Sequence, residues 1–139
     1  FTSNILKNKK IDVFNKGKHE RDFTYIDDIV NCIILAVNKI PKKDKQYNPL
    51  KPNPKHSYCP YRIINIGGNN PIKLEYFIKL IEKNLNKKSK KNYLSLQKGD
   101  VIKTHSSLNW SYKIIKYKPK IKPQVGVKLF LEWFKKYYT

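Results

Sequence analysis

Apolar side chains recur at intervals of three and four residues in two long segments of this chain, which predicts two amphipathic helices. The Thr24 hydroxyl is expected to cap the first helix, with Asp27 reaching back three residues later as in a capping box. Pro41 is expected to end this helix. The apolar positions are Ile26, Ile29, Val30, Ile33, Val37 and Ile40 in the first helix, and Leu74, Phe77, Ile78, Ile81 and Leu85 in the second.

Short runs rich in β-branched and aromatic residues predict strands around these helices. Residues 61–68 (YRIINIGG) have the composition of a buried strand, and residues 91–100 (KNYLSLQKGD) predict a strand that ends in a turn. The remaining predicted elements are a strand at 11–14, an extended piece at 22–24, and helices at 107–115 and 125–138. This order of strand, helix, strand, helix, strand, helix, helix indicates an α/β fold.

Length and composition are those of one folded domain, residues 1–139, with a core of its own. Residues 41–60 hold five prolines and no hydrophobic period, which predicts a long surface loop. No apolar run approaches the roughly 20 residues of a membrane span. Two cysteines without CxxC spacing favour a reducing cytoplasm. The chain has no Met and opens on Phe1, so we expect it to be truncated at its N-terminus.

The net charge of +20 raises the possibility of a basic nucleic-acid-binding domain, since Lys and Arg neutralise phosphates. Only Arg21 and Arg62 among the 30 basic residues are arginine, the better bidentate reader of bases and phosphates. The lysines are spread along the whole chain, and Lys, Ile and Asn together suggest an A/T-rich genome. We therefore expect no nucleic-acid partner and keep that domain as the alternative from another class.

The sequence offers no catalytic, metal-binding or cofactor-binding motif of its own. The three histidines lack ligand spacing, and no Ser lies in a G-x-S-x-G elbow. Two Tyr-x-x-x-Lys matches are no more than chance predicts from 10 Tyr and 28 Lys. The Gly67-Gly68 turn fits neither G-x-G-x-x-G nor a P-loop and is more typical of a structural turn.

The segment GKHERDFTYIDD, residues 17–28, carries one of the two arginines directly before a predicted helix start. An Arg at this place can present its planar fork to a phosphate or carboxylate, and the helix N-terminus adds positive potential. An ion pair between Arg21 and an Asp that holds a turn is the other interpretation. These physical arguments leave both open.

Four segments in order carry a resemblance to a known family: IDVFNKGKHERDFTYIDDIV, YRIINIGGNNPIKLEYFIKLIEKNLNKK, LQKGDVIKTHSSLNW and YKPKIKPQVGVKLFLEWFKKYY. Together they resemble the C-terminal part of NAD-dependent nucleotide-sugar epimerases and dehydratases, of the extended short-chain dehydrogenase/reductase (SDR) family. The likeness covers essentially the whole chain and is closest to the UDP-glucuronate 4-epimerase (CapI-like) branch. RDFTYIDDIV is specific for the extended family, and KNYLSLQKGDV narrows it to uronate epimerases less securely.

The resemblance implies that the chain forms the C-terminal substrate-binding lobe and the last elements of a Rossmann-type fold. The N-terminal NAD-binding part, with its glycine-rich turn and catalytic Tyr/Lys pair, is expected to be absent from these residues. By the same resemblance, Arg21 grips the UDP diphosphate, Val13 and Phe14 surround the uracil, and Gln97 and Asp100 line the nucleotide pocket. Members of that family carry an Asp where this chain has Ser107, so the chain departs from the family pattern at the start of the predicted 107–115 helix.

The activity implied by the resemblance is inversion at C4 of a UDP-sugar, with NAD exchanging the hydride and a Tyr moving the proton. The complete enzyme is expected to be a cytoplasmic homodimer, and this portion alone is expected to be inactive. A nucleotide-sugar dehydratase or another epimerase of the family is the alternative within the same class.

Overall fold

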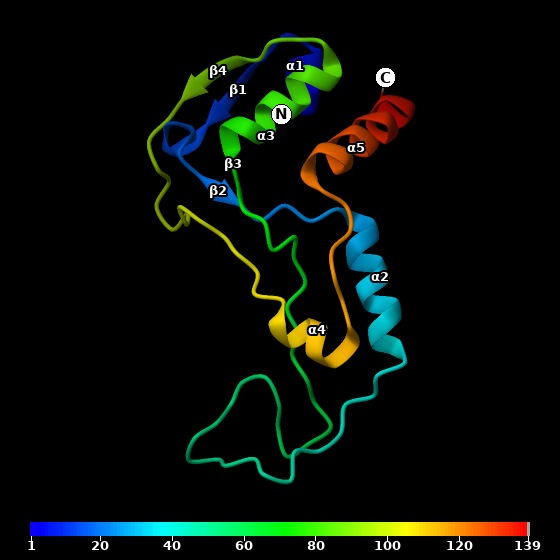
Figure 1. Cartoon of the computed structure of the whole chain (residues 1–139). Coiled ribbons are helices and arrows are strands. Elements are labelled where there is room, and N and C mark those ends of the chain that lie inside the picture. The colour runs from blue at the N-terminus through cyan, green and yellow to red at the C-terminus, as the bar shows by residue number, and fades with distance from the viewer. Residues whose placement is uncertain (139) are drawn as a thin grey trace.

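The computed structural model describes residues 1–138 and has an α/β architecture in which helices predominate (Figure 1). Its strands form a parallel pair, β1 with β4, and an antiparallel pair, β2 with β3. In chain order the elements are α1 (Thr2–Leu6), β1 (Lys10–Val13), the 3-10 turn η1 (Phe14–Gly17), β2 (Glu20–Arg21), α2 (Ile26–Val37), β3 (Ile72–Lys73), α3 (Leu74–Leu85), β4 (Lys90–Tyr93), α4 (Asn109–Ile115) and α5 (Pro123–Tyr138).

The main core lies where α3 packs against the β1–β4 pair, α1 and α5. Helix α3 has the bounds predicted from its apolar spacing, and Asn86 ends it in the left-handed conformation that Asn tolerates better than most residues. Its buried side chains meet apolar residues of the neighbouring elements. This cluster consists of Ile5, Ile11, Val13, Ile78, Leu80, Ile81, Leu85, Val127 and Leu131.

A second, smaller cluster joins α2 to α4 and to the segment that follows α4. Its buried members are Cys32, Leu108, Ile115 and Tyr117. Figure 1 shows α2, α4 and the long 41–60 loop on one side of the molecule, with the α1, α3, β1 and β4 group on the other. Residues 41–60 contain no helix or strand, and turns closed by Asp44, Asn48 and Asn53 side chains order them locally.

Three local predictions are wrong. Residues 61–68 form no strand, because the described chain supplies no neighbouring strand and Arg62 makes only an isolated bridge with His56. Thr24 does not cap α2, which begins at Ile26 after Tyr25 and has no side-chain cap. Pro41 does not end α2, whose last residue is Val37, with Asn38 as its C-cap. Strand pairing lies at Glu20–Arg21, directly before the extended piece predicted at 22–24.

No helix among residues 1–138 combines the length and the apolar character that crossing a membrane requires. Within the same residues, His, Cys, Asp and Glu side chains form no group of three that could hold a metal ion.

Candidate functional site

Strand β2 lies between two segments that are distant in sequence, β3 and residues 102–104. On one side it pairs with β3, and on the other Glu20 N–H donates to Ile102 O at 2.9 Å while Thr104 N–H donates to Glu20 O at 3.1 Å. Lys103 Nζ lies 2.8 Å from Glu20 Oε2, and its hydrogen bond and charge lower the pKa of the Glu20 carboxyl. This pairing holds the turn at residues 97–100 beside Arg21, about eighty positions away in the chain.

Arg21 is fixed on this framework by three hydrogen bonds. Nη1 donates to Glu20 O at 3.0 Å and to Ile102 O at 3.1 Å, and Nη2 donates to Asp100 Oδ1 at 2.8 Å. The Arg21 side chain remains 24% exposed. The ion pair considered from the sequence therefore exists, and its partner is Asp100, itself a predicted site residue.

The guanidinium still has donors to offer. Arginine carries five N–H groups, and the three bonds above leave two of them, the Nε–H and one N–H of Nη2, without a partner in residues 1–138. Two donors on a rigid, partly exposed guanidinium suit the two-point recognition of a phosphate. An ion pair and an anion contact are thus compatible at Arg21.

Asp22, the next residue, has a structural role. Its carboxylate accepts hydrogen bonds from the backbone N–H groups of Asn69, Asn70 and Ser106 at 2.9–3.1 Å. A Cβ on Gly67 would lie 2.2 Å from the Ser106 side chain, and one on Gly68 would lie 2.5 Å from Phe23 O. The two glycines therefore serve close packing around Asp22, and the space beside them is filled.

The other predicted site residues differ in accessibility. Phe14 is half-buried at the end of β1, while the Val13 side chain is fully buried in the main core. Gln97 is exposed, and its carbonyl accepts the Asp100 N–H at 3.2 Å across a turn. Gly99 has φ +82° in that turn, a conformation that favours glycine. The structure thus joins Arg21 to Asp100 directly, while neither Phe14 nor Gln97 forms a hydrogen bond with Arg21.

His19, which no sequence motif singled out, has a side chain that is only 3% exposed. Its Nε2 lies 3.2 Å from Asp100 Oδ2, within ion-pair distance but without the alignment of a hydrogen bond. A signal for this position was available, because residues two apart in an extended segment face the same side, and His19 and Arg21 are two apart.

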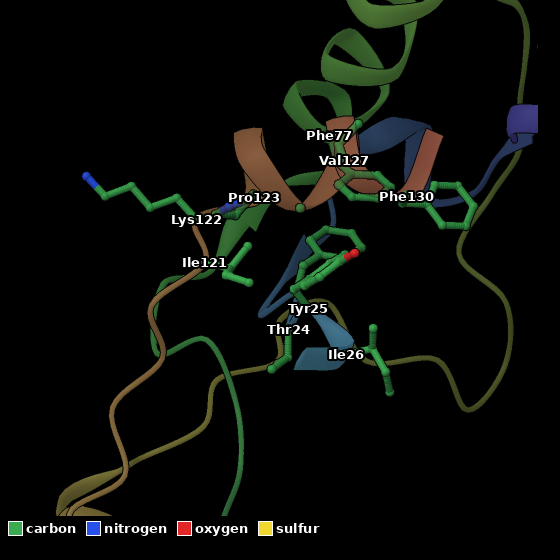
Figure 2. Close-up of a pocket in the computed structure, with 11 residues that line it drawn as sticks. Thr24, Tyr25, Ile26, Phe77, Ile121, Lys122, Pro123, Val127 and Phe130 are labelled. Atoms are coloured by element: carbon green, nitrogen blue, oxygen red, sulfur yellow. The ribbon is translucent and has the colours of Figure 1, made fainter. Parts of the chain in front are cut away.

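A separate apolar hollow of about 280 Å³ lies between the N-terminus of α2, the start of α3 and the first turns of α5 (Figure 2). Phe23 and Phe77 line the hollow with their rings stacked, the ring centroids lying 3.8 Å apart. Tyr25 and Phe130 line it as well. Burial and the Asp27 and Glu132 carboxylates raise the pKa of the Tyr25 hydroxyl. None of the predicted site residues lines this hollow, so it is distinct from the Arg21 site.

Comparisons with known proteins point to one family. Residues 1–67 match the model of the NAD dependent epimerase/dehydratase family. Protein CapI of Staphylococcus aureus is 41% identical to this chain over 138 residues, and a probable UDP-glucuronate 4-epimerase of Rhizobium meliloti is 32% identical over 139. Both alignments cover 99% of this chain and 41% of the relative, so the chain spans about two fifths of their length.

The fold is also found in a solved enzyme. A mutant UDP-glucuronic acid 4-epimerase from Bacillus cereus, in complex with UDP-4-deoxy-4-fluoro-glucuronic acid and NAD, superposes with a TM-score of 0.78 and 25% identity. The superposition covers 99% of this chain and 38% of that enzyme. The α/β prediction and the resemblance recognised in the sequence are therefore confirmed.

Proposed function

We propose that this chain is the UDP-sugar-binding portion of a nucleotide-sugar 4-epimerase, because residues 1–67 match the NAD dependent epimerase/dehydratase model and the whole chain aligns with the same relatives. UDP-glucuronate is the proposed sugar nucleotide, because the relatives include a probable UDP-glucuronate 4-epimerase and a solved UDP-glucuronic acid 4-epimerase. The observation that carries the proposal is the Arg21 guanidinium, held in place by three bonds with two N–H groups left for an anion.

In the proposed complex, the two remaining N–H groups of Arg21 bind the diphosphate of UDP. Such bonds are charge-assisted on both sides and are shorter and stronger than neutral ones. Asp100 and Gln97 contact the nucleotide from the adjacent turn, and Phe14 offers an aromatic face to the uracil. Val13, whose side chain is fully buried, contributes by fixing the end of β1, which Phe14 directly follows as the first residue of η1.

The residues present do not fit NAD. The chain has no glycine-rich dinucleotide fingerprint, and its single Gly-Gly turn is packed against Ser106 and Phe23. We therefore assign no step of the C4 inversion to these residues. The NAD-binding site and the catalytic Tyr/Lys pair are proposed to belong to polypeptide outside this chain, and this portion alone is proposed to be inactive.

Helix α2 supplies the surface on which such a portion would pack. Of its apolar side chains, Ile33, Ile34 and Val37 are 53%, 57% and 71% exposed, and Ile26 and Val30 are exposed as well. Contiguous apolar surface of this kind is characteristic of interfaces. Homodimer formation and the cytoplasmic location of the complete enzyme stay predictions.

The test is calorimetric titration of UDP into the full-length protein and its Arg21→Ala variant. We expect Arg21→Ala to weaken UDP binding by about 1.5–3 kcal/mol, the range for hydrogen bonds to charged groups. Arg21→Lys is expected to recover only part of this loss, because an ammonium keeps the charge without the fork. Arg62→Ala is the matched control, since it removes the chain's other arginine, and it should leave the affinity unchanged.

The same titration separates the alternatives. Tighter binding of dTDP or GDP than of UDP would indicate a dehydratase or another epimerase of the family. Binding to DNA with a steep loss of affinity as salt rises, combined with no UDP binding, would overturn the proposal in favour of a nucleic-acid-binding domain.

A further inference from the structure

His19 lies where β2 meets the start of α3, next to the proposed UDP site. It directly precedes β2, and its carbonyl accepts the Leu74 N–H at 2.8 Å, where α3 begins. Its side chain is 97% removed from solvent, although it stands next to an exposed Lys18. A polar ring this deeply buried is expected to have a hydrogen-bonded partner.

The polar group nearest to this ring is the carboxylate that holds Arg21. Asp100 Oδ2 lies 3.2 Å from His19 Nε2, and Asp100 Oδ1 lies 2.8 Å from Arg21 Nη2. The two oxygens of one carboxylate are therefore divided between two partners. Nε2 has no aligned acceptor in the described residues, and a small rotation of either group would supply one.

This division determines what Arg21 can offer a ligand. An aspartate with both oxygens free tends to bind a guanidinium through two parallel N–H···O bonds. At Arg21 such a fork would occupy one of the two N–H groups that the proposed function assigns to the diphosphate.

We propose that His19 is a positioning residue that engages Asp100 Oδ2 and so restricts Asp100 to a single bond with Arg21. The guanidinium then keeps two N–H groups for the UDP phosphates. This inference rests on the proposed function for its ligand, whereas the His19–Asp100–Arg21 arrangement can be tested without any ligand.

Three substitutions of His19 test this role: Gln can still donate a hydrogen bond to Asp100, whereas Leu and Asn cannot. His19→Leu fills the space without a donor, and His19→Asn places its amide too far back. We expect both to weaken UDP binding about tenfold, which corresponds to one hydrogen bond at a charged group. His19→Gln places an amide N–H near the position of Nε2 and is expected to bind UDP within about twofold of the original protein.

A spectroscopic measurement reports on the arrangement itself. The ¹H–¹⁵N signal of the Arg21 Nε–H can be assigned by its loss in Arg21→Lys, and this chain contributes only one other arginine. In His19→Leu and His19→Asn this signal should move downfield and exchange more slowly as Asp100 forms the two-point contact. In His19→Gln it should stay in place.

The outcomes distinguish this inference from the proposed function. Unchanged UDP affinity and an unchanged Nε–H signal in a folded His19→Asn protein would overturn the role of His19, even if Arg21→Ala abolishes binding. If Arg21→Ala leaves UDP affinity unchanged, the proposed function fails, and the Nε–H signal still decides whether His19 restrains Asp100. Thermal unfolding of each variant shows which proteins are folded and can be compared.

Discussion

Helices α2 and α3 each have twelve residues and an apolar periodicity, yet they are stabilised in opposite ways. Helix α3 buries Ile78, Leu80, Ile81 and Leu85 in the main core. Helix α2 buries only Asp28 and Cys32 and leaves most of its isoleucine and valine side chains exposed. The difference lies in their neighbours, since α3 has the β1–β4 pair and α5 against it, whereas α2 packs mainly on α4 and the segment after it.

The comparison shows that an amphipathic pattern identifies an apolar face without identifying what covers it. In α2 a polar anchor takes the place of the missing apolar partner. Asp28 Oδ1 accepts the Lys120 N–H and Asp28 Oδ2 accepts the Ile121 N–H, both at 3.0 Å. The segment before α5 is thereby tied to α2 through backbone groups that would otherwise need water.

The largest expected effect separates the two helices directly. Ile78 is 0% exposed, so Ile78→Ala should lower the free energy of unfolding by about 4 kcal/mol through lost burial and a cavity. Ile33→Ala removes the same atoms from the exposed face of α2 and should change it by no more than about 0.5 kcal/mol. Urea denaturation of the 139-residue chain measures both values. Equal costs would mean that the α2 face is covered in solution.

A second substitution tests the polar anchor of α2. Asp28 is 2% exposed, and Asp28→Ala removes two charge-assisted hydrogen bonds. The free energy of unfolding should therefore fall by about 3 kcal/mol. Asp27→Ala is the matched control, because Asp27 lies in the same first turn but is exposed. Denaturation of the two variants side by side gives the comparison. A loss of similar size in both would assign the effect to the helix dipole and not to the anchor.

The smallest expected effect concerns the cluster beneath α2. The Tyr117 hydroxyl donates a hydrogen bond to Gly67 O at 3.1 Å. Tyr117→Phe should therefore lower the free energy of unfolding by about 1 kcal/mol at pH 8. Burial, followed by the charges of Asp28, Cys32 and Asp22, raises the pKa of Tyr117 to about 12.

The raised pKa of Tyr117 gives this prediction a pH dependence. The unfolded tyrosine loses its proton near pH 10, before the folded one, so the contribution of Tyr117 to stability is complete below pH 10. It is expected to fall by about 2 kcal/mol as the pH rises from 10 to 12. In Tyr117→Phe the free energy of unfolding should not show this additional loss between pH 10 and 12. Thermal unfolding of both proteins across that range measures the difference. Parallel pH curves for the two proteins would contradict it.

Elements with a complete local signal could be predicted from the sequence. Helix α3 has its predicted bounds, and the strand and turn predicted within 91–100 appear as β4 and the 97–100 turn. The run 61–68 was misassigned because β-branched residues favour a strand only where another strand lies alongside. The predicted Thr24 cap failed because α2 begins at Ile26, so Tyr25 and not Thr24 is the residue at the cap position.

The sequence by itself determined the α/β class, the apolar faces of the helices and the unusual placement of Arg21 in a chain that uses lysine almost everywhere else. These properties depend on residue type and short spacing, which are readable along the chain. Only the tertiary structure decided that Arg21 meets Asp100 and that a buried His19 faces the same carboxylate. The reason is physical: strand pairing between Glu20 and residues 102–104 sets these contacts, and hydrogen bonds between residues so far apart leave no periodic trace in the sequence.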